Sequence, residues 1–281
     1  EPSASADSPA KVAAVMFEDF YGFSNTPFSR SIPTDMLYHG NDSDELIERL
    51  KYAATRQLFA VMTGDSGTGK TTTLRRFHDE LRSSRYQVLY LSDSKMTPRL
   101  FYRALLEQLG CSAKYYRGEA KRQLHKEIEI MKGVHGLLPV VIVDEAHLLD
   151  RDMLEEIRFL LNFKMDSQSP MSLILSGQSE LWERLKLQSF AAIRQRIDVQ
   201  CGVGHMDRLQ TAEYIKTHLN YAGCDKDIFS DAAVDDVFHF SSGISRLINR
   251  ACTSSLIYGA QNRKNIIDDR MVKLVIECEL T

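Results

Sequence analysis

Short apolar runs alternate with amphipathic stretches from about residue 44 to residue 201. The runs are 58–63, 86–91, 138–143, 171–176 and 197–201. Continuous apolar runs of this length are typical of strands buried on both faces, as in a parallel sheet covered by helices. Between two of them, the stretch from Pro98 to Gly110 has helical spacing, with the proline near its start and the glycine as the expected C-cap. This pattern predicts an α/β core.

After Gly204 the pattern becomes helical throughout. The expected helices lie near 207–222, 230–241, 244–261 and 268–279, with Asp207, Ser230 and Asp268 as N-caps. We therefore expect an α/β domain over 44–203 and an all-helical domain over 204–281. Residues 1–15 are small and polar and are expected to form a disordered leader, whereas 16–43 are too apolar for a free tail.

A glycine-rich segment follows the first predicted strand and precedes a predicted helix. It runs Gly64, Asp65, Ser66, Gly67, Thr68, Gly69, Lys70, Thr71, Thr72 and matches G-x-x-x-x-G-K-T. In this Walker A pattern, main-chain N–H groups and the helix N-terminus surround phosphate oxygens. Lys70 is placed for the β- and γ-phosphates and Thr71 for Mg²⁺. The segment predicts binding of a nucleoside triphosphate such as ATP.

Two acids end the third predicted strand. Asp144 and Glu145 follow the apolar run 138–143, at the carboxyl edge of a parallel sheet, where ligands bind. We expect Asp144 to hold Mg²⁺ and Glu145 to polarise the water that attacks the γ-phosphate. A water-polarising acid indicates hydrolysis of ATP to ADP and phosphate, because a kinase has to exclude water from this position.

Composition excludes some classes of protein. The 281 residues are 43% hydrophobic and 26% charged, which is typical of a globular chain. No apolar run approaches the roughly 20 residues of a membrane span, and we expect a cytoplasmic protein. Because the net charge is −3, any contact with nucleic acid requires a local basic patch.

The order of these motifs resembles that of the AAA+ ATPases. The resemblance covers about residues 20–280 and implies a parallel five-stranded sheet in the order 5-1-4-3-2, followed by a helical lid. Within that family the chain is most similar to the ExeA/GspA-like group and its relatives, the transposition regulators TniB, TnsC and MuB. The likeness lies in the opening segment "FYGFSNTPFS" and in "LILSGQSEL" after the fourth predicted strand.

The resemblance implies further site residues. Ser176 and Gln178 end the fourth strand, where the family keeps a polar sensor near the γ-phosphate; Gln178 is favoured, and a simple polar turn is the alternative. Arg194 and Arg196 precede the fifth strand, where the family presents an arginine finger to a neighbouring subunit of a homo-oligomer. Arg196 is favoured, and one of the two arginines could instead serve a surface ion pair.

Two other regions complete the implied nucleotide site. Arg246, in "GISRLIN", resembles the lid arginine that reaches the γ-phosphate, although Ser245 replaces a common proline and an exposed helix cation is the alternative. In the family, the N-terminal segment packs near the adenine. Phe28, Ile32 and Pro33 are the candidates for that contact, and ordinary core packing is equally consistent with them.

Two weak basic patches are the only local sign of nucleic acid. The candidate DNA contacts are Lys95, Thr97, Arg99, Arg103, Lys114, Arg117 and Lys121. Such cations would contact phosphates without reading bases. Acids are interspersed among them, so a solvated helix face is the alternative.

The resemblance leaves three functions open. One is an ATP-dependent regulator of transposition that binds duplex DNA and recruits a transposase. The second is an ATPase of a general secretion system, whose full-length members carry a membrane span and a peptidoglycan-binding domain that we do not expect in this chain. The third is a STAND-like signalling ATPase.

Overall fold

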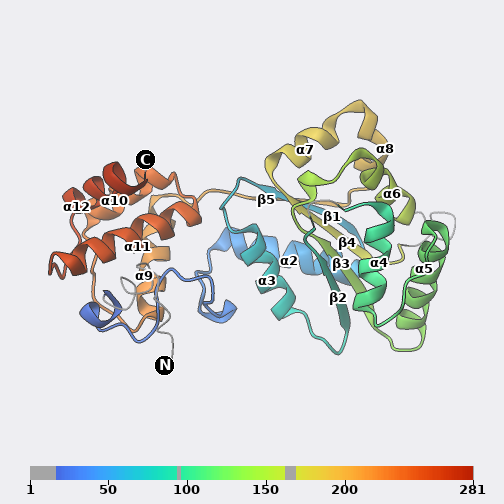
Figure 1. Cartoon of the computed structure of the whole chain (residues 1–281), viewed down its shortest axis with the longest axis horizontal. Helices are drawn as coiled ribbons and strands as arrows, with labels where there is room; N and C mark the ends of the chain where they lie inside the picture. Colours follow the sequence, from blue (N-terminus) through green and yellow to red (C-terminus); the bar gives the residue numbers. More distant parts are fainter. Residues whose placement is uncertain (1–16, 94–95, 162–168, 281) are drawn as a thin grey trace, which may run out of the picture. The chain divides into compact units, whose positions relative to one another are not determined.

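The computed structural model describes residues 17–93, 96–161 and 169–280 and divides into two compact units. One unit covers Asn41–Gly204 and contains the sheet (Figure 1). The other combines residues up to Gly40 with those from His205 onward and is helical. The N-terminal segment therefore folds with the C-terminal helices and not with the sheet.

Five parallel strands form the sheet in the order β2-β3-β4-β1-β5. The strands are β1 (Phe59–Gly64), β2 (Tyr86–Leu91), β3 (Leu138–Val143), β4 (Ser172–Gly177) and β5 (Val199–Val203). Counted from the other edge, this is the expected order 5-1-4-3-2, which confirms the predicted α/β fold. Two strands match their predicted bounds, and the other three begin one or two residues later.

Helices cover both faces of this sheet (Figure 1). They are α2 (Asn41–Arg56), α3 (Lys70–Glu80), α4 (Pro98–Gln108), α5 (Arg117–Gly133), α6 (Arg151–Leu161), α7 (Ser179–Lys186) and α8 (Ala191–Arg194). Short 3₁₀ turns occupy Ala146–Leu148 (η2) and Gln188–Phe190 (η3). As predicted, Pro98 begins α4, where its missing N–H costs no hydrogen bond, and Gly110 follows the helix with φ +74°.

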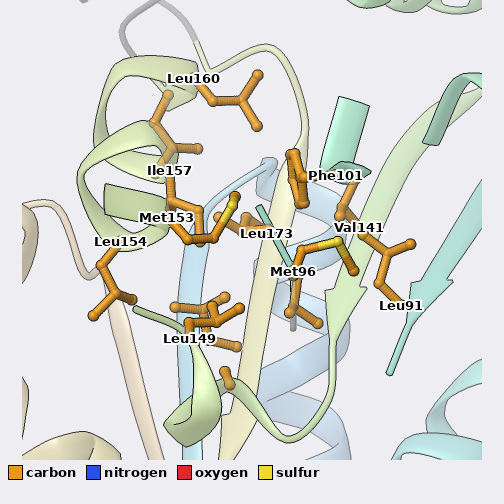
Figure 2. Packing of buried hydrophobic residues seen from close by; sticks show 14 of the residues in the cluster. Leu91, Met96, Phe101, Val141, Leu149, Met153, Leu154, Ile157, Leu160 and Leu173 are labelled. Carbon is orange, nitrogen blue, oxygen red and sulfur yellow. The ribbon is translucent and has the colours of Figure 1, made fainter. Parts of the chain in front are cut away.

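Successive side chains of the strands enter two separate apolar clusters, as their pleat requires. On one face, Ala60 and Met62 of β1 pack with α2 and α3. On the other, α6 packs on the sheet, and Figure 2 shows Met153 and Ile157 directed toward Leu173 of β4. Each such side chain stabilises the fold by about 1.5–3 kcal/mol relative to exposure. The burial of both faces explains why the strands read as continuous apolar runs.

The helical unit has its own core. Its helices are α9 (Arg208–Tyr221), α10 (Asp231–Ser241), α11 (Ser245–Gln261) and α12 (Asp269–Val275), followed by a π-helical turn at Ile276–Leu280. Asp207, Ser230 and Asp268 are N-caps, as predicted, and each side chain accepts a main-chain N–H of the first turn. In the N-terminal segment, a 3₁₀ turn spans Thr34–Met36.

Candidate nucleotide site

The phosphate loop joins β1 to α3 and holds its lysine in place. Lys70 is buried, and its Nζ donates to the carbonyl oxygens of Gly64 at 2.9 Å and Asp65 at 2.8 Å. Gly69 precedes the helix with φ +102°, a conformation that other residues rarely adopt. The loop thus wraps around the ammonium group, which places a positive charge at the helix N-terminus, where phosphates bind.

The start of this loop has no room for a side chain. A Cβ atom on Gly64 would lie 2.6 Å from the carbonyl oxygen of Val203 on β5. Farther along, Thr68 is buried and donates to the Asp65 carbonyl at 2.9 Å. Ser66, Gly67 and Thr72, the remaining candidates of the Walker A pattern, belong to the loop or to the first turn of α3.

Asp144 accepts hydrogen bonds from four groups that come from four parts of the chain. On Oδ2 it accepts the hydroxyls of Thr71 at 2.9 Å and Tyr90 at 3.0 Å. On Oδ1 it accepts the hydroxyl of Ser176 at 2.8 Å and the main-chain N–H of Glu145 at 2.9 Å. Only 3% of Asp144 is exposed, so these donors replace water around a buried carboxylate. The two predicted metal ligands, Thr71 and Asp144, are therefore in direct contact.

Tyr90 is a site residue that the sequence reasoning missed. It is the next-to-last residue of β2, an apolar strand in which tyrosine is common. The only sign of a role in the sequence is its hydroxyl group near the carboxyl end of a strand. Burial and the nearby Asp144 carboxylate raise the pKa of Tyr90 to about 12. Its hydroxyl consequently stays protonated at neutral pH and serves as a donor to Asp144.

Glu145 adopts a backbone conformation that is unusual for its type. Its φ is +53°, in the left-handed region, which costs a non-glycine residue roughly 1–2 kcal/mol. Its main chain is held at both ends, since its N–H donates to Asp144 and its carbonyl accepts the N–H of Leu148 at 2.9 Å. The side chain is 44% exposed, and Oε2 lies 3.5 Å from Nδ1 of His147.

The turn between β4 and α7 contacts several parts of this site. Ser176 is fully buried on Asp144, and the hydroxyl of Ser179 donates to Oδ1 of Asp65 in the phosphate loop at 2.8 Å. Gln178 is the N-cap residue of α7, and its main-chain N–H donates to Nδ1 of His147 at 3.4 Å. Of the two sensor candidates, Ser176 makes the direct side-chain contact with Asp144. A contact of Gln178 with the γ-phosphate stays a prediction.

The two finger candidates differ in their surroundings. Arg194 donates through its guanidinium to the carbonyl oxygens of Leu185, at 3.3 Å, and Lys186, which end α7. It thereby binds acceptors that the end of a helix leaves unsatisfied. Arg196 lies beyond α8, in the turn that precedes β5, and is partly exposed.

Arg246 and the N-terminal candidates lie in the helical unit. Arg246 is exposed in the first turn of α11. Phe28 and Ile32 are buried, and the ring of Phe28 stacks on His218 of α9 with centroids 5.1 Å apart. Pro33 precedes the 3₁₀ turn at Thr34–Met36. A contact of any of these residues with the nucleotide stays a prediction.

Mg²⁺ fits the residues that the sheet edge provides. This ion usually retains several waters and takes one or two protein oxygens besides the phosphates of its substrate. Asp144 and Thr71 would supply those oxygens, and the four donors around Asp144 fix the orientation of its carboxylate.

Several candidate DNA contacts have acidic partners. Arg103 pairs with Glu107 at 2.7 Å on the surface of α4. Lys121 and Arg117 lie 3.2 and 3.6 Å from Glu156, whose side chain is only 8% exposed. Burial alone would raise the pKa of Glu156, but the hydrogen bond from Tyr102 and the nearby cations outweigh it and lower that pKa. Lys121 and Arg117 therefore compensate a buried charge.

Another candidate, Arg99, lies beside two exposed tyrosines. Tyr115 and Tyr116 are 67% and 68% exposed, and the guanidinium of Arg99 lies 4.0 Å from the centroid of the Tyr115 ring. Lys114 is exposed beside them. The hydroxyl of Thr97 accepts the N–H of Leu100 and so caps α4. Lys95 lies outside the described residues.

Comparison with known proteins finds a family that is similar to this part of the chain. The family model described as "AAA domain" matches residues 53–185, which include the phosphate loop and both acids. That part of the chain is similar to AAA domains. The predicted resemblance to AAA+ ATPases of the ExeA/GspA-like group, related to transposition regulators, is confirmed by this match together with two relatives.

Those two relatives differ in the processes that their names describe. The chain is 29% identical over 246 residues to General secretion pathway protein A of Aeromonas hydrophila, covering 86% of this chain and 44% of that protein. It is 30% identical over 145 residues to Mu-like prophage FluMu DNA transposition protein B of Haemophilus influenzae, covering 51% of this chain and 46% of that protein. The chain thus spans less than half the length of either relative.

Solved structures support the same fold. A chain in the structure of Drosophila ORC bound to DNA has a TM-score of 0.64 at 18% identity, covering 98% of this chain and 69% of that one. The RuvB Holliday junction branch migration motor of Thermotoga maritima has a TM-score of 0.58 at 16% identity, covering 85% and 69%. At these identities the likeness concerns the AAA+ fold alone.

Among the residues that the structure describes, no helix has the length and apolar character needed to cross a bilayer.

Proposed function

We propose that this AAA domain binds ATP with Mg²⁺ and hydrolyses it to ADP and phosphate. The observation that carries the proposal is the hydrogen bonding of Asp144, which links Thr71 of the phosphate loop to Ser176 of β4 with Glu145 beside it. A P-loop lysine, an oriented metal-binding carboxylate and an adjacent acid are the parts that hydrolysis of a γ-phosphate requires.

Each part has a separate task in this proposal. Lys70 and the main-chain N–H groups of the loop hold the phosphates, and Asp144 with Thr71 holds the ion. When bound, Mg²⁺ neutralises charge on the phosphate oxygens. Glu145 accepts a proton from the attacking water, and its partly exposed side chain leaves solvent access to that position.

A neighbouring subunit would complete this site. We assign the arginine finger to Arg196, the candidate that the resemblance favours, and a local role at the end of α7 to Arg194. In a homo-oligomer, Arg196 would stabilise charge that develops on the γ-phosphate of the adjacent subunit. Bound ATP would then hold the assembly together, and its hydrolysis would release it.

Release of phosphate from ATP tests the enzymatic proposal. We expect Mg²⁺-dependent turnover by the wild-type chain and its loss in Glu145→Gln, with ATP still bound. Glu155→Gln is the matched control, because Glu155 is an exposed acid of α6 that pairs with Arg151 on the surface. Turnover by Glu145→Gln at the wild-type rate would contradict the role given to Glu145.

As its biological role we propose ATP-dependent regulation of DNA transposition, with duplex DNA and a transposase as partners. Two observations favour it. One is the 30% sequence identity over 145 residues to a DNA transposition protein. The other is an exposed cluster that consists of Arg99, Lys114, Tyr115, Tyr116 and Arg117. Arginine and tyrosine side chains of this kind can contact phosphates and sugars. The similarity to General secretion pathway protein A supports the second candidate, an ATPase of a secretion system. A STAND-like signalling ATPase is the third.

Binding to non-specific duplex DNA distinguishes these candidates. We expect binding at low salt with a slowly hydrolysed ATP analogue, and weaker binding by Lys114→Glu. Lys226→Glu is the control, because it makes the same charge change at an exposed site in the helical unit. Absence of binding in the wild-type chain would favour a secretion or signalling role, and equal loss in both variants would remove this cluster as the contact surface.

A further inference from the structure

His147 lies between the proposed catalytic acid and the turn that begins α7. Its side chain is 7% exposed, and its Nδ1 atom has two partners within 3.5 Å. One is Oε2 of Glu145 at 3.5 Å, and the other is the main-chain nitrogen of Gln178 at 3.4 Å. A single nitrogen thus connects the end of β3 with the end of β4.

These two partners require opposite states of Nδ1. The N–H of Gln178 can only donate, so it needs an unprotonated Nδ1 that accepts. The ionised carboxylate of Glu145 can only accept, so it needs an Nδ1 that carries a proton. Both separations exceed the usual 2.9–3.0 Å of an N–H hydrogen bond, and a small rotation of the ring would favour one partner over the other.

The main chain around His147 is held by hydrogen bonds, so a change of partner at Nδ1 requires only side chains to move. The carbonyl oxygen of His147 accepts the guanidinium of Arg184 at 2.7 Å, and that of Leu149 accepts it at 2.8 Å. The main chain of Glu145 is held by Asp144 and Leu148. Movement at this point is therefore restricted to the Glu145 side chain and the imidazole ring.

We propose that His147 is a positioning residue that holds Glu145 or releases it, according to which partner its Nδ1 atom binds. When Nδ1 accepts the N–H of Gln178, Glu145 has no donor from His147 and its carboxylate is available to the attacking water. When Nδ1 donates to Glu145, the carboxylate is turned toward His147 and away from the attacking water. Because Gln178 begins α7, a shift of that turn would be transmitted to Glu145 through His147.

This inference rests on the proposed ATPase function, and variants of His147 test it. His147→Phe keeps the ring and removes both nitrogens. His147→Asn keeps an acceptor at the position of Nδ1, because Oδ1 of asparagine is also two bonds from Cβ. We expect His147→Phe to lower kcat by about 10- to 100-fold with KM for ATP nearly unchanged, because the Gln178 N–H loses its acceptor and the turn that begins α7 loses its tie to the site. His147→Asn should retain most of the activity.

His135→Phe, at an exposed histidine that precedes β3, should leave turnover at the wild-type rate. Equal rates for His147→Phe and His147→Asn, whether both normal or both low, would overturn the proposal. Absence of turnover in the wild-type chain would instead contradict the ATPase function itself.

A spectroscopic measurement on the wild-type chain is independent of both turnover and folding of the variants. The ¹⁵N chemical shift of a histidine nitrogen distinguishes its protonated from its unprotonated form. With Mg²⁺ and a non-hydrolysable ATP analogue bound, we expect an unprotonated Nδ1 on His147 that accepts the Gln178 amide. A protonated Nδ1 in that complex would overturn the proposal.

Discussion

The hydroxyl of Ser176 donates to Oδ1 of Asp144 at 2.8 Å, with both side chains buried between β3 and β4. Hydrogen bonds to charged groups contribute about 1.5–3 kcal/mol, and a buried carboxylate that loses a donor is penalised. We expect Ser176→Ala to lower the free energy of unfolding by that amount in urea titrations, and to slow ATP turnover. Ser172→Ala is the control on the same strand, because Ser172 donates to the neutral carbonyl of Leu58. Equal losses in the two variants would contradict a special role for the carboxylate.

A second prediction concerns the role of Lys70 in ATP binding. Its Nζ is held by two loop carbonyls, so Lys70→Met removes the charge that phosphates would meet without removing a large part of the core. We expect ATP affinity to fall at least about tenfold, or ~1.4 kcal/mol, by calorimetric titration. Lys51→Met, at a lysine of α2 that pairs with Glu48 and Glu80, should bind ATP as the wild type does. Unchanged affinity in Lys70→Met would argue against this loop as the phosphate site.

The two arginines before β5 should behave differently. Arg194→Ala removes the donor to the end of α7, and we expect it to lower stability by about 1 kcal/mol, measured by thermal unfolding. Arg196→Ala should retain ATP affinity but lose turnover.

Mixed oligomers test the assignment of Arg196 directly. Subunits with Arg196→Ala keep a working Glu145, and subunits with Glu145→Gln keep a working arginine. Mixing the two inactive proteins should therefore restore part of the turnover, because some interfaces combine both intact residues. Failure to restore activity, when the two proteins co-assemble, would indicate that Arg196 acts within its own subunit.

His218 makes the helical unit sensitive to acid. It is 2% exposed, its ring stacks with Phe28 and contacts the tilted ring of Tyr214, and within the described chain neither of its ring nitrogens has a hydrogen-bond partner. Burial lowers its pKa to about 4 from about 6.5. As the pH falls from about 6.5 to 4, the unfolded chain takes up a proton that the folded chain does not. The free energy of unfolding should therefore fall, by up to roughly 3 kcal/mol.

His218→Phe tests this effect. Phenylalanine preserves the ring stacking and carries no titratable nitrogen, so urea titrations at pH 7 and pH 4.5 should show a smaller difference than in the wild type. His239→Phe changes an exposed histidine of α10 and should keep the full pH dependence. If the pH dependence of His218→Phe matches that of the wild type, another group is responsible.

Local features of the sequence predicted the elements and the phosphate loop. Strand β3, the caps at Asp207, Ser230 and Asp268, and the loop from Gly64 to Thr72 all follow from residues near one another in the chain. Burial on two faces produces a continuous apolar run, and a helix start requires an acceptor for its free N–H groups. These requirements are local, and a single sequence therefore displays them.

Tertiary structure alone decided which distant side chains meet. Tyr90 and Ser176 both reach Asp144, although they are 54 and 32 residues away from it along the chain. Arg194 is distinguished from Arg196 by its contact with the end of α7, and Phe28 packs against His218 in the helical unit. A hydrogen bond or a ring stack depends on distances of a few ångströms between folded elements. Spacing along the sequence does not contain those distances, whereas the periods of strands and helices are present in it.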